Sequence, residues 1–334
     1  MQLGPVKTHG RTQNVVIDVD TGVDDALALL FAVRHPGLRV HAITCVAGNA
    51  AVEQVVRNTL TVLEHADAPP IPVAAGAARP LIAPPHDASH VHGRDGMADL
   101  GLPPSPRKPD PRHAVELLRD VLRDAAEPVT LIALAPLTNI ALLARTYPEA
   151  MQRLERIVVM GGTASTGNAT PVAEFNAWHD PEAAAIVFAA GVPVTMYGLD
   201  VFYRVGVAAA GCDKLAAHEH RSARLAGQLL RHQLRTAAGE ARTELGMATI
   251  GDAGAVCAVA DPAGLVTAHL PVQVELAPGF GRGQTVVDRR ARSGEQELHG
   301  MAAPAARLDV AIDVDAARYG DLFLSTILGE PGTS

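Results

Sequence analysis

The sequence predicts an α/β fold in which helices cover both faces of a mainly parallel central sheet. Strand-like runs alternate with helical runs along the chain, the strand-like runs are nearly continuously apolar, and no linker divides the 334 residues. The expected strands lie at 15–20, 40–48, 129–135, 156–162 and 193–201. The expected helices lie between them, at 24–35, 50–66, 113–127, 137–148 and 180–191.

Other stretches depart from this alternation. Residues 79–111 are rich in Pro, Gly and His, which predicts a long surface loop of the kind that often carries function. Residues 202–250 read as mostly helical. The C-terminal part has strand-like runs at 271–276, 285–290 and 306–314 before a final helix. We therefore expect a flexible tail at 1–13 and a single domain at 14–330.

Composition excludes several classes of protein. A net charge of −8 argues against a nucleic-acid partner, which would favour a basic face. No apolar run is long enough to predict a membrane span, and the first 13 residues do not resemble a secretory signal. Cys45, Cys212 and Cys257 lack paired spacing and read as reduced thiols. The expected location is cytoplasmic, with no membrane partner.

The stretch VVIDVDTGVDDALALL (15–30) gathers four aspartates, Asp18, Asp20, Asp24 and Asp25, where a buried strand runs into a helix. Alternation along the strand puts Asp18 and Asp20 on one side, and the other two open the helix, whose N-terminus favours anions. Open parallel sheets bind ligands at this edge. Helix capping and a solvated turn would explain only Asp24 and Asp25. Converging carboxylates instead favour a hard cation such as Ca²⁺ or Mg²⁺.

Two known cation motifs do not fit this stretch. An EF-hand loop starting at Asp18 would need Gly and Glu where Val23 and Leu29 stand. A phosphatase of the haloacid dehalogenase type would need Thr or Val in place of Gly22, and a later Asp in place of Val256.

The segment DVDTGVDDALAL (18–29) closely resembles the signature of the inosine-uridine type nucleoside hydrolases, with Thr21 in place of the usual Pro. AITCVAGNA (42–50), HVHGRDGM (90–97, resembling an active-site flap), GNATPVAEFNAWHDPEAA (167–184) and GDAGAVCAVADP (251–262) follow in family order. The chain is identified by this resemblance as a family member, which implies a Rossmann-like nucleoside hydrolase fold.

The resemblance implies a calcium-dependent N-glycosidase that cleaves ribonucleosides into free base and ribose. Asp24 matches the general base for a metal-bound water, and Asp18 matches a supporting carboxylate. The matched metal ligands are Asp20, Asp25, Asp252 and the backbone carbonyl of Leu134. The matched ribose-binding positions are Asn49, Met160, Asn168, Glu174 and Asn176, with Asn168 near the 5′-hydroxyl. The family habit implies a homodimer or homotetramer.

One departure concerns the leaving base. Some relatives carry His directly before the last metal Asp, where this chain has Gly251. Residues 230–250 also lack the tyrosines that some relatives offer to the base. Candidate replacements are His92 on the flap, together with His232, Gln233, Arg235 and Arg242. Trp178 reads mainly as a packing residue.

Two alternative functions stay open at this point. One is a hydrolase of another N-riboside on the same fold, since only the ribose-binding residues are clearly legible. The other is a non-catalytic nucleoside- or ribose-binding protein, against which Asp24 argues, because a binder has little need of a general base.

Overall fold

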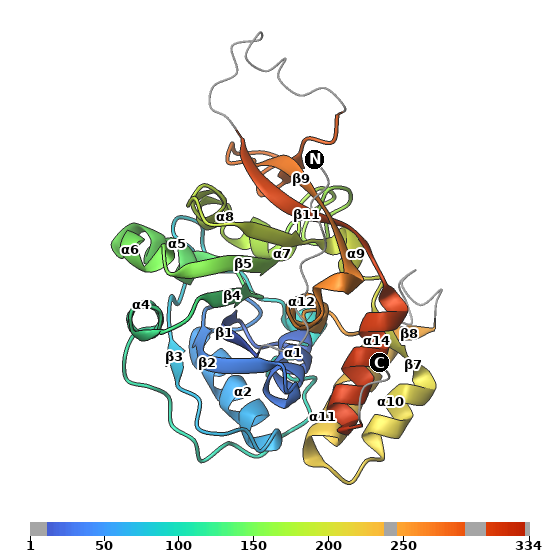
Figure 1. Cartoon of the computed structure of the whole chain (residues 1–334). Coiled ribbons are helices and arrows are strands. Elements are labelled where there is room, and N and C mark those ends of the chain that lie inside the picture. The colour runs from blue at the N-terminus through green and yellow to red at the C-terminus, as the bar shows by residue number, and fades with distance from the viewer. Residues whose placement is uncertain (1–11, 237–245, 291–304, 331–334) are drawn as a thin grey trace.

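A computed structural model describes residues 12–236, 246–290 and 305–330 (Figure 1). Within these residues, nine strands form the central sheet in the order β10-β9-β11-β6-β5-β4-β1-β2-β3. Their bounds are β1 Gln13–Val19, β2 Leu38–Cys45, β3 Val73–Ala75, β4 Val129–Ala133, β5 Leu154–Met160, β6 Val194–Tyr197, β9 Leu265–Val274, β10 Thr285–Val287 and β11 Ala306–Val314. A separate antiparallel pair joins β7 (Gly206–Ala208) to β8 (Met247–Thr249).

Strand pairing is parallel from β3 through β11, and β9 pairs antiparallel with both β11 and β10. The mainly parallel sheet is therefore confirmed, with an antiparallel extension at one edge. Chain order runs outward in opposite directions from β1 and β4, which are neighbours. This reversal leaves a crevice beyond the carboxyl ends of the strands, where open α/β sheets bind ligands.

Helices cover both faces of the sheet (Figure 1). Along β1, Val15 and Ile17 pack into one apolar cluster with α1 and α2, while Val16 packs into another with α4 and α5. This two-residue alternation is the strand period. The helices are α1 Val23–Arg34, α2 Val52–His65, α3 Ser89–His92, α4 Ala114–Asp124, α5 Thr138–Thr146, α6 Pro148–Met151, α7 Phe175–His179, α8 Pro181–Phe188, α9 Leu199–Phe202, α10 Ala209–Ala216, α11 Arg221–Thr236, α12 Ala253–Ala260, η3 Pro262–Gly264 and α14 Ala316–Leu328.

The structure departs from the expected elements in several places. Strand β3 was not expected, and the strand expected at 271–276 is β9, which spans Leu265–Val274. The strand expected at 193–201 ends at Tyr197, because Gly198 caps the short helix α9. The region 202–250 contains β7 and β8 as well as helices. The expected surface loop 79–111 carries α3, and Met97 and His92 in this segment are buried, so part of it folds onto the molecule.

The expected tail falls almost wholly outside the described residues. Residues 1–11 are not described, and Gln13, which we placed in the tail, is the first residue of β1. All the described residues after Gln13 lie within the expected domain 14–330.

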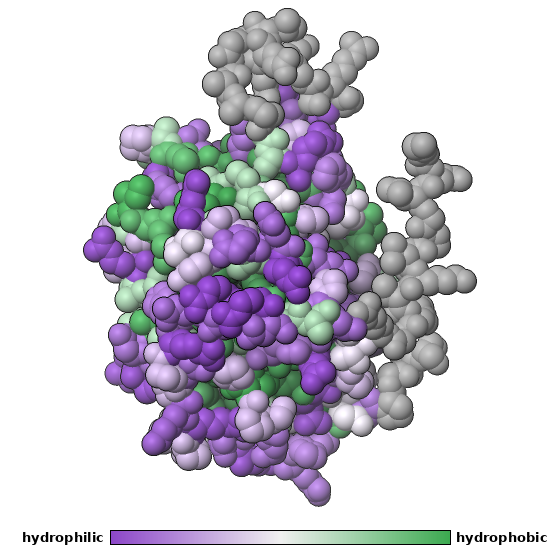
Figure 2. Space-filling view, turned by 60° about the vertical axis from the view of Figure 1, so that its left-hand side comes forward, coloured by the Kyte–Doolittle hydropathy of each residue, from purple (hydrophilic) through white to green (hydrophobic). Residues whose placement is uncertain are grey.

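The face in Figure 2 is mainly hydrophilic, with apolar residues in small groups. Across the described residues, we find no helix with the length and apolar character needed to cross a membrane.

Candidate active site

A cavity of about 510 Å³ opens at the carboxyl edge of the sheet, within the size range typical of small-molecule sites. It brings together most of the residues predicted for the site. Those lining it are Asp24, Asn49, His92, Leu134, Met160, Asn168, Glu174, Asn176, His232 and Asp252. The other three predicted residues, Asp18, Asp20 and Asp25, are at most 1% exposed and lie in or after the strand that leads into the site.

The turn between β1 and α1 sets the first carboxylates. Asp25 caps the start of α1: its Oδ2 accepts the Gly22 N–H at 2.9 Å and its Oδ1 accepts the Asp20 N–H at 3.2 Å. Asp20 Oδ2 in turn accepts the Asn49 N–H at 2.7 Å. Gly48 makes this contact possible, because a Cβ there would lie 2.0 Å from Asp20 Oδ2. The strand end, helix start and loop after β2 are thus locked together.

Thr21, which replaces the usual Pro, takes part in the same turn. The Thr59 hydroxyl donates to the Val55 carbonyl at 2.9 Å, so the Thr21 hydroxyl donates to Thr59 Oγ1 at 2.6 Å. This bond ties the turn to α2. Thr21, the residue that departs from the family signature, is therefore held by a hydrogen bond to α2 in this chain.

Three carboxylates meet at the floor of the cavity. Asp24, Asp25 and Asp252 each place an oxygen within 4.8 Å of the others. We predicted Asp20, Asp25 and Asp252 as the ligand carboxylates. The tightest group instead contains Asp24, and Asp20 lies beside Asp25. Among the described residues, Asp20 Oδ1 and Asp24 Oδ1 are buried without a hydrogen-bond partner.

Burial and mutual repulsion perturb these groups. Burial, and then the charge of Asp24, raises the pKa of Asp25 to about 7. Burial also raises the pKa of Asp20 and of Asp252 well above the usual range, with neighbouring aspartates adding to the effect. Several desolvated carboxylates with unpaired oxygens are costly alone, and a divalent cation with a preference for oxygen ligands would neutralise them. The residues present therefore fit a metal site.

Asp18 lies beneath this group. Its Oδ1 accepts hydrogen bonds from Thr44 Oγ1 at 2.5 Å and from Asn139 Nδ2 at 2.8 Å. Burial raises its pKa to about 7. Asn139 also donates to the Cys45 carbonyl, so Asp18 links the ends of β1 and β2 to α5.

Glu174 and Asn176 form a second wall. Glu174 caps α7, its carboxylate accepting the N–H groups of Asn176, Gly162 and Ala177 at 2.8, 2.9 and 3.1 Å. Burial raises the pKa of Glu174 to about 7, against the opposing effect of these bonds. Asn176 Nδ2 donates to the carbonyls of Leu134 and Met160 at 3.0 and 3.1 Å.

The predicted ligand carbonyl of Leu134 therefore already accepts one hydrogen bond. A carbonyl oxygen has two lone pairs, so this bond leaves one for a further interaction. Farther out, Asn168 is exposed: its Oδ1 accepts the Phe175 N–H at 2.8 Å and its Nδ2 donates to Tyr203 Oη at 3.4 Å.

The flap and α11 cover the opposite side. His92 Nδ1 accepts the Val23 N–H at 3.2 Å and lies 3.7 Å from Asp24 Oδ1. With Nδ1 accepting, the neutral ring carries its proton on Nε2. His232 Nε2 lies 3.4 Å from the Val91 carbonyl on α3. His92 thus belongs to the flap, and His232 approaches the flap from α11.

Several cavity residues were missed or read differently from the sequence. Trp178 lines the cavity besides packing against His86, with ring centroids 4.8 Å apart. His86, Tyr203 and Thr249 line it too, and no sequence pattern marks them. Trp178 had a usable signal, since it follows Glu174 and Asn176 within one family segment. Of the other leaving-group candidates, Gln233 lines the cavity, Arg235 is exposed, and Arg242 lies outside the described residues.

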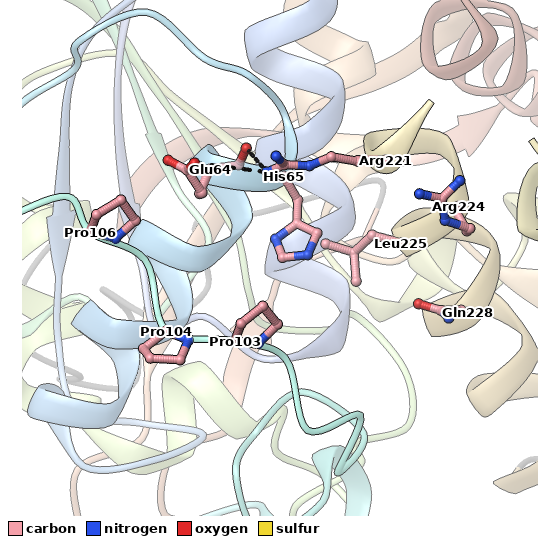
Figure 3. Close-up of a pocket in the computed structure, with 9 residues that line it drawn as sticks. All are labelled: Glu64, His65, Pro103, Pro104, Pro106, Arg221, Arg224, Leu225 and Gln228. Atoms are coloured by element: carbon pink, nitrogen blue, oxygen red, sulfur yellow. Dashed lines mark hydrogen bonds and ion pairs between the residues drawn. The ribbon is translucent and has the colours of Figure 1, made fainter. Parts of the chain in front are cut away.

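A second hollow, of about 450 Å³, lies between the end of α2, the proline segment 103–106 and the start of α11 (Figure 3). Its lining carboxylate, Glu64, already pairs with Arg107 at 3.1 Å. Arg221 donates to the Glu64 carbonyl, and Arg224 donates to the His218 carbonyl at 2.9 Å. This hollow lacks converging carboxylates along its described lining, so the chemistry favours the larger cavity.

Comparisons with known proteins identify the family of the chain. The profile of the family described as inosine-uridine preferring nucleoside hydrolase matches residues 15–321. The non-specific ribonucleoside hydrolase RihC of Salmonella enteritidis is 40% identical over 306 residues, which cover 91% of this chain and 95% of that protein. The pyrimidine-specific ribonucleoside hydrolase RihA of Salmonella gallinarum is 38% identical over 308 residues, covering 92% and 96%.

A solved structure shows the same fold. The purine-preferring ribonucleoside hydrolase from Gardnerella vaginalis superimposes with a TM-score of 0.85 at 29% identity, covering 95% of this chain and 98% of that one. The nucleoside hydrolase fold predicted from the sequence is therefore confirmed. The chain belongs to the inosine-uridine preferring nucleoside hydrolase family and is an enzyme that hydrolyses N-glycosidic bonds.

Proposed function

We propose that the enzyme hydrolyses ribonucleosides with one Ca²⁺ held by the carboxylates at the cavity floor, and that Asp24 acts as the general base. The observation that carries the proposal is the convergence of Asp24, Asp25 and Asp252 within 4.8 Å, beneath a cavity of nucleoside size.

The proposed metal-holding residues are Asp20, Asp25, Asp252 and the Leu134 carbonyl. Ca²⁺ accepts more oxygen ligands, and a more irregular arrangement, than Mg²⁺, which suits a mixed set of carboxylates and a backbone carbonyl. A bound cation supplies one element of the chemistry, lowering the pKa of a nearby water. Asp24 lines the open cavity, whereas the neighbouring Asp20 and Asp25 do not, so its carboxylate is the one of these three that a water in the cavity can reach.

Asp24 has the position expected of a base. It is the member of the four-aspartate motif that lines the cavity, and its side chain is 18% exposed. In the proposed step, a water oxygen bonds to C1′ of the ribose as its proton passes to Asp24. The glycosidic bond breaks with its electron pair on the base nitrogen, and a proton completes the free base. Asn49, Glu174 and Asn176 hold the sugar hydroxyls while the ring carries positive charge.

The proton for the base has two proposed sources. His92 presents Nε2–H once Val23 occupies Nδ1, and it sits against Asp24. His232 lines the same cavity from α11. We propose His92 as the main donor, because a backbone hydrogen bond fixes its ring.

The test is a panel of purine, pyrimidine and nicotinamide ribosides with free ribose measured. Release from common ribonucleosides supports the proposal, whereas release only from nicotinamide riboside favours another N-riboside hydrolase. Tight binding without ribose release would indicate a binding protein. The same preparation, measured by light scattering, tests the proposed homodimer or homotetramer.

The base is tested with Asp24→Asn and Asp20→Asn side by side. Loss of a general base lowers turnover by about 10²–10⁴-fold. We expect Asp24→Asn to lower kcat by this amount while keeping Ca²⁺ and substrate binding. Asp20→Asn should lose Ca²⁺ as well. If Asp20→Asn keeps Ca²⁺ but loses kcat, and Asp24→Asn instead loses substrate binding, the base is Asp20.

A further inference from the structure

Gly251, directly before Asp252, has a backbone that disfavours side chains. Its φ is +56°, in the left-handed region. A Cβ at this position would lie 2.6 Å from Asp24 Cβ, 3.3 Å from Asp24 Oδ2 and 3.1 Å from Phe202 Cζ. The nearest of these contacts is with the first carbon of the Asp24 side chain, which is fixed by the helix backbone and cannot swing aside.

The backbone at Gly251 cannot retreat from this contact. Its N–H donates to Thr249 Oγ1 at 3.1 Å, and that hydroxyl lies 3.2 Å from the carbonyls of both Phe202 and Val205. The Ile250 N–H donates to the same Val205 carbonyl at 3.1 Å. The segment before Asp252 is thereby fastened to the end of α9, the helix that carries Phe202.

Asp24 cannot retreat either. Its neighbours Val23 and Asp25 are buried at the start of α1, and Ala26 and Leu27 are fully buried in the core. Asp25 is further held by the Gly22 and Asp20 N–H groups. A side chain at 251 would therefore displace the start of α1, or the Asp24 carboxylate itself, relative to Asp252.

We propose that Gly251 is a positioning residue, whose missing side chain lets Asp24 stand beside Asp252 in the reactive arrangement. The inference rests on the proposed role of Asp24. On this interpretation, Gly251 is more than the loss of the His that some relatives carry. The absence of a side chain is a steric requirement of this chain's site, and an acidic group cannot be carried at this position. Protonation of the leaving base must come from another wall of the cavity, such as the flap.

The test compares Gly251→Ala with Gly101→Ala. Gly101 has φ +62° with no atom within 4 Å of a Cβ, so it reproduces the backbone strain without the contact. A misplacement of about 1 Å can cost about 10²-fold in rate. We expect Gly251→Ala to lower kcat by about that factor with KM and Ca²⁺ stoichiometry nearly unchanged. Gly101→Ala should keep wild-type kcat. Equal kcat in the two variants overturns the inference.

A double-mutant comparison tests whether Gly251 acts through Asp24. In the Asp24→Asn background, Gly251→Ala should lower kcat less than about threefold, because the group that it displaces has already lost its function. A loss as large as in the wild type overturns the inference.

A stability readout covers the case in which Gly251→Ala folds poorly. Asp24→Gly removes the opposing Cβ, so Gly251→Ala should lower Tm less in that background than in the wild type. An equal drop in Tm overturns the inference. Full kcat in Asp24→Asn would instead defeat the proposed base, while the Tm coupling would still report on the contact.

Gly251→His adds a contrasting outcome. A histidine that acted as a donor here would speed inosine hydrolysis relative to p-nitrophenyl riboside. We expect both substrates to slow together, because the displaced group is Asp24. A selective gain on inosine contradicts the inference.

Discussion

The proposed ribose end and the proposed base end of the cavity are built differently. At the ribose end, Glu174 accepts three backbone N–H groups at 2.8–3.1 Å, and Asp20 accepts the Asn49 N–H at 2.7 Å. At the proposed base end, His92 Nδ1 accepts the Val23 N–H at 3.2 Å, and His232 Nε2 lies 3.4 Å from the Val91 carbonyl. The first set lies directly after the buried strand β1 and at the start of α7, and the second on a flap and a helix.

This difference predicts where selectivity is strict. When buried polar groups are held in place by backbone hydrogen bonds, a substrate that leaves them unpaired loses much of its binding free energy. Longer contacts on half-exposed elements can adjust to different partners. We therefore expect the ribose to be recognised tightly and the base loosely.

The largest effect should follow loss of a carboxylate at the ribose end. Asp252→Ala removes one of the three converging oxygens and should abolish both Ca²⁺ binding and ribose release. Several kcal/mol of transition-state stabilisation correspond to about 10³-fold or more. The measurement is metal content beside kcat/KM, with Gly101→Ala as the folded control. Retained Ca²⁺ with full activity would show that Asp252 is not a ligand.

The next effect concerns the sugar. Asn49, Glu174 and Asn176 are proposed to pair with ribose hydroxyls, so 2′-deoxyuridine should be a poorer substrate than uridine by about 10³-fold or more in kcat/KM. Comparable values for the two substrates would remove the distinction between a strict ribose end and a tolerant base end.

The base end should give a smaller, substrate-dependent effect. His92→Ala removes the proposed proton donor and should slow inosine by about 10²-fold, while p-nitrophenyl riboside, which has a good leaving group, is nearly spared. His232→Ala should cost less. In the wild type, the activated riboside should be cleaved faster than inosine or uridine; the reverse order would mean that a strong acid is present.

The smallest effect is on stability in the metal-free protein. Burial raises the pKa of Glu174 from 4.5 to about 7, so the native state holds this proton after the unfolded chain has lost it. Stability should therefore fall as pH rises from about 4.5 to 7, by at most roughly 3 kcal/mol for this group. Tm measured between pH 5 and 8 should show the decline, to which the buried Asp18, Asp20, Asp25 and Asp252 also contribute, and Glu174→Gln should make it smaller. A Tm that rises across this range contradicts the assignment.

The sequence brought together the residues of the proposed ribose end better than those of the proposed base end, for physical reasons. Strand alternation and the strand-to-helix turn were enough to bring Asp20, Asp24 and Asp25 together, because all three lie within six residues. Asp252 is distant in sequence, and only the family resemblance connected it. The inclusion of Asp24 in the tightest group depends on side-chain directions that the motif does not encode.

The base end could not be predicted in the same way. His86, Tyr203 and Thr249 come from separate loops and strand ends, and each alone is an ordinary residue in its segment. The strands β7 and β8 have three residues each and lie among helical patterns, so tertiary pairing decides them. The antiparallel edge formed by β9 and β10 likewise depends on pairing with β11.

The central claim is that the carboxylates at the cavity floor hold the cation on which hydrolysis depends. The direct measurement strips the wild-type enzyme with a chelator, then titrates Ca²⁺ while recording both bound metal and ribose released from uridine. We expect no activity in the stripped enzyme and recovery in proportion to one Ca²⁺ bound per chain. Full activity without metal, or recovery unrelated to the bound Ca²⁺, would contradict the account.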